Sequence, residues 1–188
     1  PPRSTLFPYT TLFRSGGPNI GLECKQYLKN AGRPSLVAGE VMSTSPGNLP
    51  CKRVIHAVGP RWRSSSALNC EQELKNCVTN CFDQLEIEGF RSIAIPPIST
   101  GVFRFPIDRA AQVVIQAIMS RDGENKLPAK VVLIDTKQGS LHLYKTYLDS
   151  SGASPILDNV TDSEMRKKTT ESCEYTPTAI CLHPVVII

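Results

Sequence analysis

A short strand, a loop and the start of a helix are encoded together in residues 92–106, SIAIPPISTGVFRFP. The apolar residues 93–95 predict a buried strand, which the two prolines that follow terminate. A Ser-Thr-Gly run stands at 99–101, and Pro106 suits the first turn of a helix. Because ligands of α/β sheets bind outside the carboxyl ends of the strands, this loop is the first candidate for a binding site.

The loop between this strand and helix has the composition of an anion site. Its small residues 99–101 let successive backbone N–H groups point at one spot, and the helix N-terminus adds partial positive charge. We therefore interpret the loop as a phosphate-binding loop, in which Phe103 covers the ligand or stacks on a sugar. The alternative is an ordinary strand-to-helix turn in which Gly101 serves only the backbone geometry.

The flanking sequence alternates between helical and strand patterns. Helices are predicted at 20–31, at 69–88, from 106 onward and at 139–148, and strands at 37–43, 53–58, 92–96 and 130–135. Residues 131–134, VVLI, are continuously apolar, which predicts burial on both faces of a parallel sheet. Strands that alternate with helices predict a layered α/β fold with a mainly parallel sheet.

The chain has 188 residues, a net charge of +4, 40% hydrophobic residues and seven cysteines. No apolar run approaches the roughly 20 residues needed to cross a bilayer, so an integral membrane protein is not expected. The odd cysteine count and irregular spacing favour reduced intracellular thiols over a secreted disulfide scaffold. Residues 1–15 contain the triplet TLF twice and two arginines without an acid, like a translated adapter or scar, and we exclude them from fold reasoning.

Without this leader, 19 basic and 17 acidic side chains leave a charge of +2, which gives no case for direct nucleic-acid binding. We expect the folded domain to occupy residues 16–150. Residues 151–179 are rich in Ser, Thr, Asp and Glu, which predicts a disordered polar linker. Residues 180–188 turn apolar again, and we expect them to begin a following domain.

Two motifs, in order, resemble the macrodomain family. The first is residues 54–60, VIHAVGP, followed by Arg61-Trp62, and the second is the strand and loop of residues 92–103. The resemblance covers about residues 16–150 and is strongest to the macrodomains of large multi-macrodomain members of the poly(ADP-ribose) polymerase family. It implies a three-layer α/β/α fold with a mixed, mainly parallel central sheet, in this chain with the first strands missing.

The resemblance also implies a pocket for ADP-ribose. The residues that would wrap its diphosphate are Ser99, Thr100, Gly101, Val102 and Phe103. Gly16 and Gly17 match the end of the family's first glycine-rich loop, and Asp135 lies where adenosine-side residues of the family fall. The family's adenine-reading Asp and the Asn residues near the distal ribose would fall before Gly16, where only the adapter-like segment stands.

The resulting hypothesis is a binding module that recognises free or protein-linked ADP-ribose, as a fragment of a multidomain ADP-ribosyltransferase in the nucleus or cytoplasm. It predicts ADP-ribosylated proteins as partners, and no cofactor, metal or membrane contact. One alternative is a hydrolase that removes mono-ADP-ribose from proteins, which needs polar groups that the remnant Gly-Gly-Pro at 16–18 does not supply. Another is a structural domain that binds no nucleotide.

Other reactive side chains favour structural roles. Cys70, Cys77 and Cys81 share one face of a predicted helix, where buried apolar cysteines are far commoner than zinc ligands. His56 alternates along a strand between apolar neighbours, which favours a structural role over that of a catalytic base. We therefore predict no catalytic residue and no metal ligand.

Overall fold

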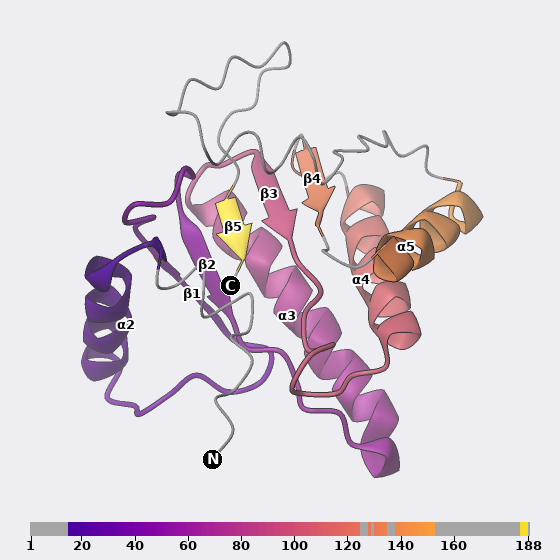
Figure 1. Cartoon of the computed structure of the whole chain (residues 1–188), viewed down its shortest axis with the longest axis horizontal. Helices are drawn as coiled ribbons and strands as arrows, with labels where there is room; N and C mark the ends of the chain where they lie inside the picture. Colours follow the sequence, from indigo (N-terminus) through magenta and orange to yellow (C-terminus); the bar gives the residue numbers. More distant parts are fainter. Residues whose placement is uncertain (1–14, 125–127, 129, 135–137, 153–184, 188) are drawn as a thin grey trace.

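The computed structural model describes residues 15–124, 128, 130–134, 138–152 and 185–187 (Figure 1). Its helices are α2 (Pro18–Asn30), α3 (Ala67–Ile87), α4 (Ile107–Gly123) and α5 (Gln138–Ser150), and a short 3-10 turn, η1 (Ser64–Ser66), precedes α3. Its strands are β1 (Val41–Thr44), β2 (Val54–Ala57), β3 (Ser92–Ile95), β4 (Lys130–Leu133) and β5 (Val185–Ile187).

The strands form one sheet in the order β1-β2-β5-β3-β4. β1 runs antiparallel to β2, whereas β2, β5, β3 and β4 are parallel. Figure 1 shows the arrowheads of these four strands pointing the same way. The turn after β2 and the loop after β3 therefore leave the sheet on the same side, at the carboxyl ends of the strands. The predicted α/β class and the mixed, mainly parallel sheet are confirmed.

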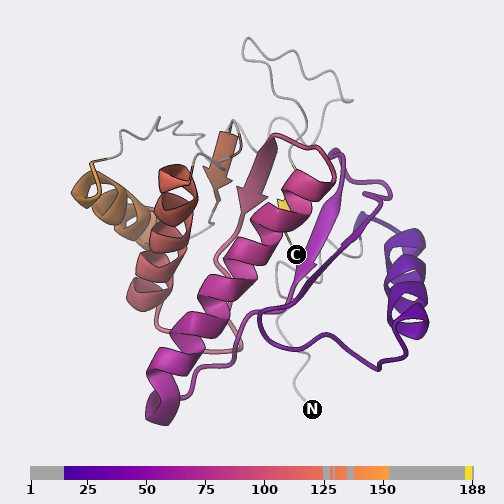
Figure 2. The ribbon, with the colours of Figure 1, turned by 180° about the vertical axis from the view of Figure 1, so that it is seen from behind.

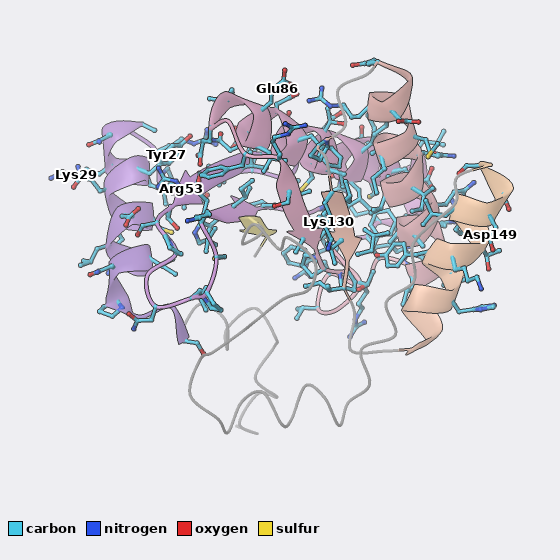
Figure 3. The ribbon with its side chains drawn as sticks, turned by 90° about the horizontal axis from the view of Figure 1, so that it is seen from above. Tyr27, Lys29, Arg53, Glu86, Lys130 and Asp149 are labelled. Atoms are coloured by element: carbon cyan, nitrogen blue, oxygen red, sulfur yellow. The ribbon has the colours of Figure 1, made fainter. Side chains whose placement is uncertain are left out.

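The helices pack along the sheet and against one another. Figure 2 shows α3 crossing one face, with α4 beside it and α5 next to α4. Viewed from above in Figure 3, Lys29 of α2 and Asp149 of α5 mark the two ends of the molecule. The helices thus lie along the sheet, and loops follow the carboxyl ends of β2 and β3 (Figure 1).

The main core lies between the sheet and α3. Apolar residues of α3 recur every three or four positions, as expected for a helix that buries one face. The buried members are Cys70, Leu74, Cys77, Val78, Cys81, Phe82 and Leu85. They pack with Ile55 of β2, with Ile93 and Ile95 of β3 and with the alanine-rich face of α4.

Two predicted strands differ from those observed. β1 begins at Val41 rather than at residue 37, because Gly39 has a φ of 91° and the Glu40 N–H donates to the Val37 carbonyl at 3.1 Å, which makes a turn. The predicted burial of the 131–134 strand on both faces is wrong. β4 stands at the end of the sheet order, and its residues are exposed or half-buried.

The C-terminal segment also differs from the expectation. Residues 180–188 are predicted to begin a following domain, but residues 185–187 form β5 between β2 and β3 of this sheet. Val186 pairs with Val54 on one side and with Ala94 on the other. The leader at 1–14 and residues 153–179 of the predicted linker lie outside the described residues.

Candidate ligand-binding site

The loop after β3 closes on itself before α4 begins. The Phe105 N–H donates to the Ser99 carbonyl and the Arg104 N–H donates to the Gly101 carbonyl, both at 3.0 Å. Ser99 and Arg104 have φ values of 65° and 55°, a left-handed conformation that costs a non-glycine residue about 1–2 kcal/mol. Strain of this kind is concentrated at functional sites.

The curved loop leaves a row of backbone donors unused. Within the part of the chain that the structure describes, the N–H groups of residues 99–103 donate no hydrogen bond, whereas those of Arg104 and Phe105 do. Consecutive N–H groups on a concave loop form an anion-binding nest. The loop leads into α4, whose N-terminus carries partial positive charge. These residues are the ones to which the family resemblance assigns the diphosphate.

Gly101 does not need to be glycine for the sake of the backbone. Its φ lies outside the left-handed region, and a Cβ added there would meet no heavy atom within 4 Å. The interpretation in which this glycine serves only the turn geometry therefore has no support in the structure. The open space above Gly101 lets a ligand approach the backbone closely.

The turn after β2 packs directly against this loop. A Cβ on Gly59 would stand 2.1 Å from the Ser99 Oγ and 2.5 Å from the Ile98 Cγ2, so only glycine allows this close approach. The Trp62 N–H donates to the Phe103 carbonyl at 2.9 Å. The two sequence motifs, which lie about 40 residues apart along the chain, are thus in direct contact.

Ser99 sits at the centre of that contact. Its hydroxyl oxygen is buried and has no hydrogen-bond partner among the described residues. A buried, unpaired hydroxyl costs free energy, which is consistent with a loop shaped for a ligand. Sequence reasoning identified Ser99 but missed its contact with Gly59, because nothing local to either residue signals the other.

The other predicted site residues lie elsewhere or outside the description. Gly17, with a φ of 82°, precedes α2, and the Gly16 carbonyl accepts a hydrogen bond from the Asn48 N–H at 3.0 Å. Among the described residues, no hydrogen bond joins these two glycines to the 99–103 loop. Asp135 lies outside the described residues.

His56 is enclosed between β1, β2 and α2. Its Nε2 lies 2.9 Å from the Thr44 Oγ1 and 3.7 Å from the Cys24 Sγ. Burial lowers the pKa of His56 to about 4, and the nearby Glu23 carboxylate only partly opposes this effect. The imidazole is therefore neutral at physiological pH, which suits the predicted structural role.

The cysteines of α3 are free thiols in the core, and each is fully buried. No group of three potential metal ligands occurs among the described residues. Within those same residues, no helix has both the length and the apolar character for a membrane crossing.

Comparison with known proteins finds relatives along most of the chain. The sequence model of the Macro domain matches residues 10–114. O-acetyl-ADP-ribose deacetylase 2 of Pantoea vagans is 35% identical over 138 residues, which are 73% of this chain and 79% of that protein. Human protein mono-ADP-ribosyltransferase PARP14 is 40% identical over 107 residues, which are 57% of this chain but only 6% of PARP14.

Solved structures agree with the sequence relatives. The Oceanobacillus iheyensis macrodomain with ADP superimposes with a TM-score of 0.67 at 31% identity, and the match covers 75% of this chain and 74% of that one. The family model spans more than half of the chain, and the structural match shows the same α/β fold. By both sequence and fold, this chain belongs to the Macro domain family.

Proposed function

We propose that this chain is a binding module for ADP-ribose and that it holds the diphosphate on the N–H groups of residues 99–103. The observation that carries the proposal is the row of five consecutive N–H groups without an acceptor among the described residues. Relatives support the choice of ligand, since one solved macrodomain holds ADP and the Pantoea relative is named as an O-acetyl-ADP-ribose deacetylase.

The chemistry of the loop fits a diphosphate. Hydrogen bonds from N–H groups to an ionised acceptor are shorter and roughly twice as strong as neutral ones. The positive end of α4 adds to the same field, and the exposed backbone at Gly101 allows close approach. Phe103, half-buried beside these donors, offers a ring face to a ribose.

The natural ligand in this proposal is ADP-ribose, either free or attached to a protein, so ADP-ribosylated proteins are the partners. The 40% identity with a segment of PARP14 supports a setting within a multidomain ADP-ribosyltransferase. A nuclear or cytoplasmic location accords with the free thiols of the described cysteines.

The second candidate is a hydrolase, which the deacetylase relatives favour. Hydrolysis needs a water held and activated beside the distal ribose. His56 is a poor base because it is buried against Thr44 and Cys24. The segment at 16–18, Gly-Gly-Pro, supplies no polar side chain. Binding is therefore favoured over turnover.

Calorimetric titration with ADP-ribose, ADP and adenosine tests the proposal. We expect ADP-ribose and ADP to bind and adenosine, which lacks the diphosphate, to bind at least tenfold more weakly. A sample that is folded by circular dichroism and yields no heat with ADP-ribose contradicts the binding module. Release of ADP-ribose from a modified protein, followed by chromatography, would instead establish the hydrolase.

A further inference from the structure

We infer that Arg61 is a ligand-binding residue whose guanidinium supplies a cation to the diphosphate held by the 99–103 loop. The inference rests on the proposed function and adds a specificity-determining side chain to it. Arg61 lies on the turn after β2, which packs against the loop, rather than on the loop itself.

Three contacts hold the turn that carries Arg61 close to the loop. The next residue, Trp62, donates its N–H to the Phe103 carbonyl at 2.9 Å. The Cys70 thiol donates to the Arg61 carbonyl at 3.5 Å, which ties the turn to α3. The Arg61 guanidinium lies over the Phe103 ring, 5.9 Å from its centre. The side chain is exposed, so its guanidinium is accessible to a bound anion.

Two neighbouring arginines already have carboxylate partners. Arg63 pairs with Glu73 at 3.1 Å, and Arg109 pairs with Glu71 at 2.7 Å. Arg61 has no ion pair with any residue that the structure describes. Arg61 stacks on Phe103, whose own N–H is one of the unused donors of the loop. Without a carboxylate partner among the described residues, its charge is available to a ligand that brings its own negative charge.

Arg104 is also without an ion pair within the described residues, but no contact places its guanidinium. The guanidinium of Arg61, in contrast, is located by the Phe103 ring. Arginine is the side chain best matched to phosphate oxygens, because its planar fork presents several parallel donors. Arg61 therefore favours ligands that carry the full diphosphate charge.

Two substitutions at Arg61 and one matched control test the inference. Arg61→Met keeps the length of the side chain and removes the charge, and Arg61→Lys keeps the charge and removes the planar fork. Arg63→Met removes a charge from the same turn at a position already paired with Glu73. The dissociation constant for ADP-ribose is measured by calorimetry for each variant at about 50, 150 and 400 mM NaCl, a range over which screening of exposed charges changes strongly.

We expect Arg61→Met to weaken ADP-ribose binding about five- to tenfold and to flatten its dependence on salt. Arg61→Lys should keep most of the salt dependence, and Arg63→Met should bind within about twofold of the wild type. Unchanged binding by Arg61→Met overturns the inference, and so does equal loss in the Met and Lys variants, which would mean that Arg61 acts only by packing on Phe103. Failure of the wild type to bind refutes the proposed function instead.

Thermal unfolding of each variant guards against a folding defect. Because Arg61 is exposed and has no ion pair among the described residues, we expect its substitutions to leave the unfolding temperature unchanged. If Arg61→Met lowers the unfolding temperature, the wild type alone still tests the inference. An ADP-ribose affinity of the wild type that does not fall with added salt contradicts a cation at the diphosphate.

Discussion

Replacing Gly101 with glutamate separates binding from folding at the proposed loop. A Cβ at this position meets no heavy atom within 4 Å, and the backbone φ lies outside the left-handed region. The residue is also exposed. The free energy of unfolding should therefore stay within about 1 kcal/mol of the wild type.

Binding should respond far more strongly than stability. A carboxylate about 5 Å from a ligand with two negative charges is repelled by about 1.7 kcal/mol at the dielectric constant of water. The dissociation constant for ADP-ribose should then rise at least about 15-fold.

Calorimetry of Gly101→Glu and Gly101→Gln, with urea unfolding of both, provides the assay. Glutamine has the same shape without the charge, so the difference between the two variants measures the electrostatic part. A folded Gly101→Glu protein that binds ADP-ribose as well as the wild type would show that the diphosphate does not lie at this loop. Equal losses in both variants would refute the electrostatic argument and leave a steric one.

Three further predictions concern the frame of the site. Val186→Pro removes an N–H from the strand between β2 and β3 and should cost about 3 kcal/mol or more in urea unfolding, so an unchanged midpoint contradicts the central place of β5. Burial lowers the pKa of His56 to about 4, below the value of about 6.5 for an unfolded chain. The contribution of His56 to the free energy of unfolding should therefore be constant above about pH 6.5. It should fall by about 3 kcal/mol between pH 6.5 and 4, because there the unfolded chain binds a proton that the folded state does not bind. Urea unfolding of His56→Gln should lack this part of the pH dependence, and an equal slope in both proteins counts against it. Arg104→Gly should raise the free energy of unfolding by about 1 kcal/mol through relief of the left-handed φ of 55°, and a lower urea midpoint would contradict that strain.

Local patterns in the sequence were sufficient for most helices and strands. The seven buried positions of α3 follow the helical period, so the bounds of this helix could be predicted to within two residues at each end. The prolines and small residues around β3 likewise marked the strand, the loop and the start of α4. These signals depend on neighbours within a few positions, and a sequence displays them directly.

Features that depend on distant contacts were not predictable in the same way. The place of β5 follows from pairing with β2 and β3, and its three residues carry no local mark of that position. The half-buried state of β4 follows from its place at the end of the sheet order, although its composition is that of a central strand. Apolar composition alone does not distinguish these two environments.

The candidate site shows the same division. The residues of the 99–103 loop could be selected from composition and from the family resemblance, but the contact of Gly59 with Ser99 required the fold. Nothing in the sequence indicated the left-handed conformation of Ser99, because serine has no preference for that conformation. The guanidinium of Arg61 over the Phe103 ring depends on the same meeting of two distant motifs.

The most direct test of the account is an amide NMR titration of the chain with ADP-ribose. The central claim is that the N–H groups of residues 99–103, which have no acceptor among the described residues, donate to the diphosphate. We predict that these five amide resonances shift most and that their hydrogen exchange slows on saturation, while the amides of Arg104 and Phe105, already bonded within the loop, change less. Saturable binding that leaves the 99–103 amides unshifted, with the largest changes elsewhere, would contradict the claim.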